Sequence, residues 1–120
     1  MMTQGLSIVI VEDDFLIAMD LADLLIGVGH DVVTIARTET DAVKAAARFH
    51  PDLMIIDGTL DEGNGLSAMD TILARGFVPH IYVTGDPAGI LAQAPDAIIV
   101  AKPFNLQGLC AAIARAQELS

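Results

Sequence analysis

The segment that decides the fold is LSIVIV, residues 6–11, and the acidic triplet EDD, residues 12–14, follows it directly. A short run rich in β-branched residues is typical of a strand that is buried on both faces of a parallel sheet. From Phe15 to Ile26 apolar residues then recur at helical spacing, until glycines interrupt the pattern. Strand, acidic turn and helix together form the first unit of a pattern that repeats.

The same alternation continues along the chain. Helical patterns lie at residues 38–49, 66–74, 88–93 and 106–118, and short apolar runs predict four more strands at residues 31–36, 53–56, 80–83 and 97–100. Five strands that alternate with five helices imply right-handed crossovers and a parallel sheet covered on both faces. No linker or low-complexity tract interrupts the alternation. We therefore predict one doubly wound α/β domain.

The composition excludes several classes of protein. With six Lys and Arg against sixteen Asp and Glu, the 120 residues carry a formal charge of −10, and 53% of them are hydrophobic. The high apolar content argues against disorder. The acidic balance disfavours nucleic acid and anionic membranes as partners. A bound cation is expected if the acids gather in one place.

Neither a membrane anchor nor a disulfide is expected. No run approaches the roughly 18 apolar residues that span a bilayer, and the first residues lack the basic start of a signal peptide. We therefore expect a cytoplasmic protein. Cys110 is the only cysteine, and in its Ala-rich stretch we expect it to be a small buried core residue.

Candidate site residues follow four of the five predicted strands. Glu12 and Asp13 come after the first, Asp57 after the third, Thr84 after the fourth and Lys102 after the fifth. Ligands of open parallel sheets bind outside the carboxyl ends of the strands, so these side chains are expected to converge on one rim. Each of them alone is an ordinary turn or surface residue. Agreement at all four strand ends argues against coincidence.

The residue types of this set suit phosphoryl transfer. Clustered carboxylates repel one another unless a proton or cation intervenes, and hard oxygen ligands suit Mg²⁺. Asp57, alone at its strand end, would accept a phosphoryl group as a carboxylate nucleophile. Thr84 and Lys102 would donate hydrogen bonds where the negative charge accumulates. Asp14, directly before Phe15, is expected to cap the following helix and not to bind metal.

Four motifs resemble those of the receiver domain of two-component response regulators: VEDD at residues 11–14, IID at 55–57, VTG at 83–85 and KPF at 102–104. The resemblance runs from about Leu6 to Glu118. It implies a flavodoxin-like (βα)5 fold with a five-stranded parallel sheet in strand order 2-1-3-4-5. A single receiver domain over residues 1–120, without an output domain, is the expected organisation.

The resemblance also implies roles for the acidic residues. Asp57 is the expected phosphoacceptor. Glu12, Asp13 and Asp57 are expected to bind Mg²⁺, together with the backbone carbonyl of Thr59. These four residues would form the metal site at the carboxyl edge of the sheet.

On the other side of the phosphoacceptor, the resemblance implies that Thr84 and Lys102 contact the phosphoryl group. The Lys-Pro peptide is commonly cis in the family, so a cis bond is expected before Pro103. Ile99 stands where many receivers have Tyr or Phe, so the usual Thr–aromatic switch cannot operate through it. Asp61 stands where receivers usually carry Pro, and it adds negative charge beside the site.

The predicted fourth helix is unusually short. Residues 86–101 leave little room for it, and Pro87, Gly89 and Pro95 interrupt it further. A Thr-Gly after the fourth strand with a shortened fourth helix is similar to some stand-alone receivers of general stress and light signalling in α-proteobacteria. We expect this helix to be short or mobile.

The sequence thus predicts a single-domain response regulator. A sensor histidine kinase or histidine phosphotransfer protein would donate the phosphoryl group to Asp57 with Mg²⁺, and the surface of the fourth helix, fifth strand and fifth helix would then signal to an unknown output protein. Beyond its own phosphotransfer and dephosphorylation we expect no enzymatic activity, and we expect a monomer or weak dimer. Two alternatives remain open: a phosphorylation-independent binding module with the receiver fold, and a phosphate sink that drains a shared kinase.

Overall fold

Five parallel strands form one sheet in the order β2-β1-β3-β4-β5. The structure is a computed structural model and describes residues 5–119. Its elements, in chain order, are β1 (Ser7–Val11), α1 (Phe15–Gly27), β2 (Asp31–Ala36), α2 (Glu39–Phe49), β3 (Leu53–Asp57), α3 (Gly65–Leu73), β4 (His80–Thr84), α4 (Pro87–Gln93), β5 (Ile99–Ala101) and α5 (Leu106–Glu118). The predicted doubly wound, flavodoxin-like fold is confirmed.

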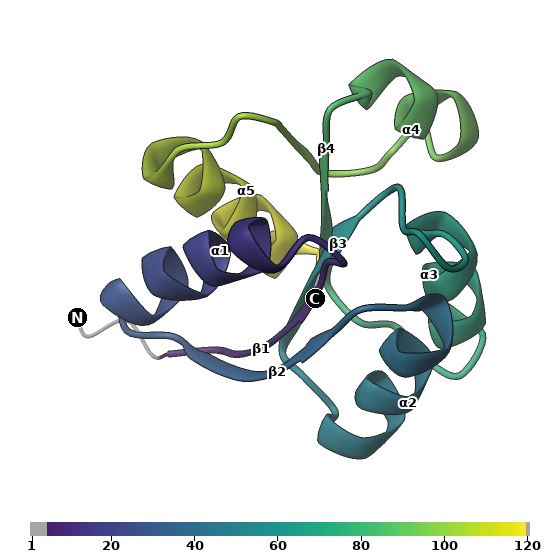
Figure 1. Cartoon of the computed structure of the whole chain (residues 1–120), viewed down its shortest axis with the longest axis horizontal. Helices are drawn as coiled ribbons and strands as arrows, with labels where there is room; N and C mark the ends of the chain where they lie inside the picture. Colours follow the sequence, from purple (N-terminus) through teal and green to yellow (C-terminus); the bar gives the residue numbers. More distant parts are fainter. Residues whose placement is uncertain (1–4, 120) are drawn as a thin grey trace.

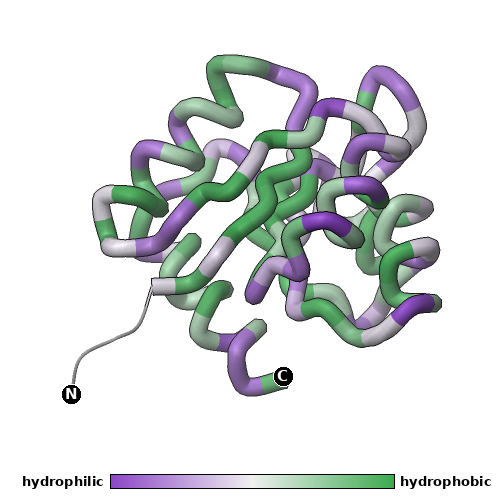
Figure 2. Tube along the Cα trace, turned by 90° about the horizontal axis from the view of Figure 1, so that it is seen from below, coloured by the Kyte–Doolittle hydropathy of each residue, from purple (hydrophilic) through white to green (hydrophobic). Residues whose placement is uncertain are grey.

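Helices cover both faces of the sheet, with α1 and α5 on one face and α2, α3 and α4 on the other (Figure 1). Successive side chains of a strand point to opposite faces. Ile8 and Ile10 therefore lie in the core beneath α1 and α5, whereas Val9 and Val11 lie in the core beneath α2 and α3. Figure 2 shows hydrophobic residues concentrated along the central strands. Burial on both faces explains why the strands are continuous apolar runs in the sequence.

Each helix begins directly after a residue whose side chain accepts a hydrogen bond from the first turn. These capping residues are Asp14, Thr38, Asn64, Asp86 and Asn105. The predicted cap at Asp14 is confirmed, because its Oδ1 accepts from the backbone N–H groups of the second and third helical residues, at 2.9 and 3.2 Å. Side-chain caps satisfy backbone donors that a helix cannot pair internally. They also fix the short turns that join strand ends to helix starts.

The α4–β5 region departs most from an ideal strand and helix pattern. α4 has seven residues, of which Ile90 is buried, and this confirms the prediction of a short fourth helix. The strand predicted at residues 97–100 lies instead at Ile99–Ala101, because β5 pairs with β4 only over these residues. The edge strand β5, with three residues, is therefore shorter than β1 and β3, which have five each.

Cys110, which was predicted to lie in the core, and Phe15, the first residue of the apolar helical pattern, both lie on the surface. Cys110 is exposed, because α5 directs its neighbour Leu109 and, one turn later, Ile113 into the core. Phe15 is 69% exposed, because α1 buries Leu21 and the other residues of that face. Helical periodicity permits one buried stripe, and both residues lie outside it. The prediction that Cys110 is buried in the core was wrong.

No helix between residues 5 and 119 combines the length and apolar character that crossing a bilayer requires.

Candidate functional site

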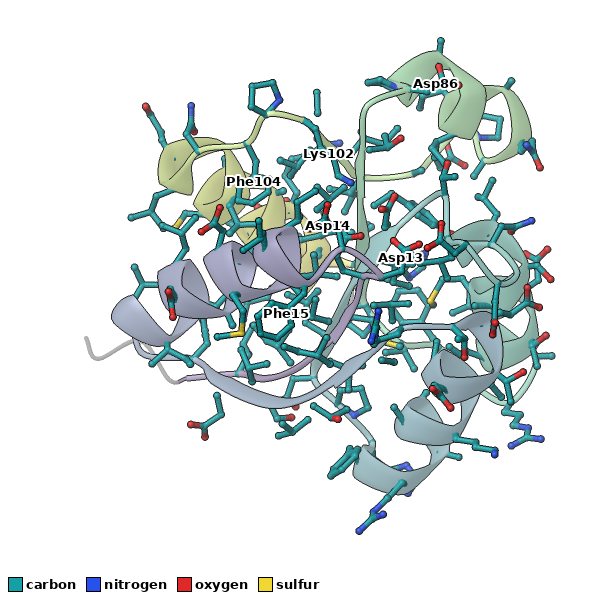
Figure 3. All side chains as sticks on the ribbon, in the orientation of Figure 1. Asp13, Asp14, Phe15, Asp86, Lys102 and Phe104 are labelled. Atoms are coloured by element: carbon teal, nitrogen blue, oxygen red, sulfur yellow. The ribbon has the colours of Figure 1, made fainter. Side chains whose placement is uncertain are left out.

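The predicted site residues lie at the edge of the sheet where the strands end. Glu12 and Asp13 follow β1, Asp57 is the last residue of β3, Thr84 is the last residue of β4, and Lys102 follows β5 directly. Figure 3 shows Asp13 and Lys102 at this edge of the molecule. The winding of the chain reverses here, between β1 and β3, which is where open parallel sheets bind their ligands.

Three carboxylates form the centre of the site. Glu12, Asp13 and Asp57 each offer one oxygen atom, and these three oxygens lie within 4.8 Å of one another. Glu12 and Asp57 are buried, with 2% and 8% of their surface exposed, and Asp13 is half-buried. Like charges that are buried this closely need a cation or a proton among them.

The ammonium group of Lys102 lies between two of these carboxylates. Its Nζ donates to Glu12 Oε1 at 3.2 Å and to Asp57 Oδ2 at 3.0 Å. Burial alone would lower the pKa of Lys102, but the hydrogen bonds and charges of Asp57 and Glu12 raise that pKa above its ordinary value. The lysine therefore stays charged and ties together the ends of β1, β3 and β5. The peptide bond between Lys102 and Pro103 is cis.

Glu12 has a strongly shifted pKa. Burial raises the pKa of Glu12 to about 7, and the hydrogen bond and negative charge of Asp57 act in the same direction. The Asp14 N–H, which donates to Glu12 Oε2 at 3.2 Å, and the Lys102 charge oppose the shift and do not cancel it. Near neutral pH a proton on Glu12 can thus offset its repulsion with Asp57 when no cation does so.

Asp13 is held by hydrogen bonds with Asp61 and Arg37. Its Oδ2 accepts a hydrogen bond from the Asp61 N–H at 2.7 Å, and Arg37 Nη2 donates to its backbone carbonyl at 3.4 Å. Partial burial alone would raise the pKa of Asp13, but hydrogen bonds from Asp61 and Glu12 lower that pKa below its ordinary value. The charge on Asp13 in turn raises the pKa of the Asp61 carboxyl group. These hydrogen bonds therefore favour the charged form of Asp13.

The loop between β3 and α3, residues 58–64, is fixed by hydrogen bonds to acidic side chains. Thr59 N–H donates to Asp57 Oδ1 at 3.0 Å, and Asn64 N–H donates to Glu39 Oε1 at 3.1 Å. Thr59 and Asn64 also pair as an antiparallel bridge, which closes the loop. Together with the Asp61 bond, these contacts tie the loop to β1, β3 and α2.

The Thr84 side of the site has fewer contacts. The hydroxyl of Thr84 is buried and accepts a hydrogen bond from the Asp86 N–H at 2.9 Å. A Cβ atom on Gly58 would lie 3.8 Å from Thr84 Oγ1, so the backbone of the β3–α3 loop runs close to this hydroxyl. Between them and α4 lies a hollow of about 250 Å³. Thr84 thus faces the same edge as Asp57 and borders open space.

The predicted switch position lies within the sheet. Ile99 is the register partner of Tyr82 on β4, and both side chains pack in the core beneath α2, α3 and α4. Tyr82 is buried, which agrees with its interpretation as an ordinary strand residue, and burial raises its pKa to about 12. An isoleucine at this point offers no aromatic ring that could rotate toward Thr84.

The donor set fits a hard divalent cation. The side chains that could bind a metal ion at the centre, Glu12, Asp13 and Asp57, offer carboxylate oxygens, which are the ligands that Mg²⁺ prefers. Three carboxylates against the single ammonium of Lys102 leave a formal excess of two negative charges, the charge that a divalent ion would match. The carbonyl of Thr59 belongs to the loop that borders these acids, and its role as a ligand remains a prediction.

Sequence reasoning missed Glu39. This acid, in the first turn of α2, also accepts a hydrogen bond from the Ser67 hydroxyl at 2.7 Å, and its pKa is lowered by Ser67 first and by Asn64 second. Gly63 has a φ of +86°, and a side chain there would overlap Glu39. The only signal in the sequence is weak: Gly63 comes directly before the cap residue Asn64, and a glycine there can mark a place where the backbone approaches another side chain closely.

Comparison with known proteins places this geometry in a family. The response regulator receiver domain model matches residues 8–114. The phyllosphere-induced regulator PhyR of Methylorubrum extorquens is 42% identical over 113 residues, which cover 91% of this chain and 42% of that protein. The transcriptional regulatory protein PdtaR of Mycobacterium tuberculosis is 33% identical over 110 residues, which cover 88% and 54%. The chain therefore spans about half the length of these curated relatives.

Solved structures agree with this result. The solution NMR structure of the Erythrobacter litoralis PhyR receiver domain superimposes with a TM-score of 0.86 at 33% identity, and the match covers 96% of this chain and 92% of that chain. The crystal structure of the anti-anti-sigma factor PhyR from Bartonella quintana gives a TM-score of 0.87 at 33% identity, over 98% of this chain and 49% of that chain. The chain belongs to the response regulator receiver domain family.

Proposed function

We propose that this chain is a response regulator receiver domain that accepts a phosphoryl group on Asp57, in a Mg²⁺-dependent reaction, from a sensor histidine kinase or a histidine phosphotransfer protein. The observation that carries this proposal is the placement of Asp57 beside the Lys102 ammonium and two further carboxylates at the carboxyl edge of the sheet. A structural ion pair would need neither of the two additional acids.

The residues of the chain account for each part of the transfer. A carboxylate oxygen of Asp57 attacks the phosphorus atom of a phosphohistidine as the bond between phosphorus and the imidazole nitrogen breaks. The imidazole nitrogen keeps the electron pair of that bond and takes up a proton. Lys102, already 3.0 Å from Asp57 Oδ2, would donate to an oxygen of the transferred group. Bound Mg²⁺, held by Glu12, Asp13, Asp57 and the Thr59 carbonyl, would neutralise charge on the phosphoryl oxygens.

The output side of the proposal concerns Thr84. A phosphoryl group on Asp57 would offer an acceptor to the Thr84 hydroxyl, whose N–H partner Asp86 caps α4. A movement of Thr84 would therefore shift α4 and change the surface that α4, β5 and α5 form. By analogy with the anti-anti-sigma factor PhyR of Bartonella quintana, we propose that this surface binds another regulatory protein and not nucleic acid.

A second candidate function is a binding module that works without phosphorylation. Ile99 removes the aromatic ring of the usual switch, and Asp61 and Glu62 add negative charge next to the metal site. Such a module would keep the fold, and its partner affinity would not change when Mg²⁺ and a phosphoryl donor are added. A phosphate sink, the third candidate, would lose its label rapidly and would slow phosphorylation of a competing receiver.

Phosphotransfer from a purified, phosphorylated histidine kinase tests the proposal. We expect wild-type protein to become labelled when Mg²⁺ is present, and labelling to cease after chelation of the metal or in the Asp57→Asn variant. Asp52→Asn is a matched control, because Asp52 is an exposed acid that bonds Ser7 at the opposite end of the sheet. Labelling that persists in Asp57→Asn would overturn the assignment of the phosphoacceptor.

A further inference from the structure

The backbone of Asp61 makes a short hydrogen bond to the acidic centre of the site. Its N–H lies 2.7 Å from Asp13 Oδ2, closer than either contact of Lys102 with the other two acids, at 3.0 and 3.2 Å. Charge-assisted hydrogen bonds of this length are stronger than neutral ones. The donor comes from the main chain, so any residue except proline could supply it.

We propose that the Asp61 N–H is a positioning group of the metal site, which fixes the carboxylate of Asp13 and thereby strengthens Mg²⁺ binding. This inference rests on the proposed Mg²⁺-dependent function. It assigns the role to the backbone of residue 61 and not to its charged side chain.

The Asp61 side chain is exposed, and its neighbours in the chain hold the peptide group that carries this N–H. The preceding residue, Leu60, is buried in the core beneath α2 and α3 with 6% of its surface exposed. The bridge between Thr59 and Asn64 closes the loop around it. A peptide group held on both sides in this way presents its donor at low entropic cost.

Asp13 needs such a partner more than the other two acids do. Glu12 and Asp57 are buried and share the Lys102 ammonium, whereas Asp13 is half-buried and follows the last strand residue by two positions. Its carboxylate has room for about four acceptor interactions, so one N–H leaves positions open for a cation. Hydrogen bonds that orient a metal-binding carboxylate typically change metal affinity by roughly 10–100-fold.

The carboxylate of Asp61 is the competing explanation for any effect at this position. It faces Asp13 and would attract a cation through its charge. Because it is exposed, this attraction is expected to be weak and to fall as the salt concentration rises. Asp61→Ala and Asp61→Pro both remove the charge, and only Asp61→Pro also removes the N–H, so the difference between these two variants isolates the hydrogen bond.

Calorimetric titration with MgCl₂ separates these contributions. We expect Asp61→Ala to stay within a few-fold of wild type, and Asp61→Pro to bind Mg²⁺ at least about tenfold more weakly than Asp61→Ala. Equal affinities of the two variants would overturn the inference and leave the proposed function standing. A wild-type protein that binds no Mg²⁺ would overturn both.

Amide hydrogen exchange in the metal-free protein tests the bond itself, even if Asp61→Pro does not fold. The Asp61 amide should exchange faster in Asp13→Ala than in wild type. The Asn64 amide, which donates to Glu39 and not to Asp13, should be unchanged and serves as the internal control. Unchanged exchange at Asp61 would show that no such bond exists in solution and would overturn the inference.

Discussion

The two sides of the site are held in different ways. On the β1–β3 side, Asp13 and Asp57 each accept a backbone N–H from the β3–α3 loop. On the β4 side, the Thr84 hydroxyl accepts from Asp86, and the helix that follows buries Ile90. The acidic side is therefore preorganised, whereas the side expected to respond has the few buried contacts that are typical of segments with low local stability. Under the proposed function, this contrast separates the groups that would catalyse the transfer from those that would transmit its result.

Of the changes considered, removal of the Lys102 charge should lower the free energy of unfolding most. Lys102→Ala leaves Glu12 and Asp57 without their shared ammonium, and breaking a buried ion pair from one side typically costs roughly 3–5 kcal/mol. We expect the free energy of unfolding, measured by urea in metal-free buffer above neutral pH, to fall by about that amount. Added Mg²⁺ should restore part of the loss. Lys44→Ala, at an exposed lysine of α2, is the control and should change it by less than about 0.5 kcal/mol. Equal effects of both variants would contradict a stabilising role for Lys102.

Matched truncations compare the two sides directly. Ile72 on α3 and Ile90 on α4 are equally buried, with 5% and 6% exposed. Ile72→Ala should cost about 3 kcal/mol, and Ile90→Ala less than about 2 kcal/mol, because α4 can open locally without unfolding the domain. Hydrogen exchange should quicken only around α4 in Ile90→Ala. Equal losses of stability would remove the proposed difference in packing.

A glycine comparison tests how tightly α3 begins beneath Asp57. A Cβ atom on Gly65 would overlap the Asp57 carbonyl oxygen, whereas one on Gly27, at the end of α1, would meet nothing within 4 Å. Thermal unfolding should show that Gly65→Ala destabilises the domain by about 1–3 kcal/mol. Gly27→Ala should be neutral or stabilise by up to about 1 kcal/mol. A neutral Gly65→Ala would mean that the acidic side is less rigid than its contacts indicate.

The pH dependence of stability should report on Glu12. Its pKa is raised on folding from 4.5 to about 7, so the native state binds more protons than the unfolded state between these values. The stability from this group is complete below about pH 4.5 and is lost as the pH rises through about 7. Urea unfolding of metal-free wild type should show this decline, and Glu12→Gln should lack it. Identical pH profiles of the two proteins would contradict the shift.

Much of the fold and of the site could be predicted because strand ends are visible in the sequence. The apolar run before Asp57 and the run before Thr84 each end at the polar residue, and parallel strands bring such ends to one edge. The helix faces were harder to predict. α1 is apolar on several sides, so periodicity could not show that Phe15 points outward.

The contacts of the β3–α3 loop could not be read from residue types. At Asp61 the sequence drew attention to the carboxylate, while the structure shows its backbone N–H in contact with Asp13. The direction of that N–H depends on the burial of Leu60 and on the bridge between Thr59 and Asn64. Glu39 was missed because its partners in the loop lie on another element of the fold.

Amide NMR spectra of the protein with Mg²⁺ and beryllofluoride, a phosphoryl mimic, test the central claim most directly. We predict chemical-shift changes that centre on Asp57 and Thr84 and extend through α4 and β5. The amides of Leu109 and Ile113, on the buried face of α5, should shift only slightly. The same additions to Asp57→Asn should give none of these changes. A wild-type spectrum without changes at Asp57 and Thr84 would contradict the assignment of a phosphoryl site and favour a binding module that works without phosphorylation.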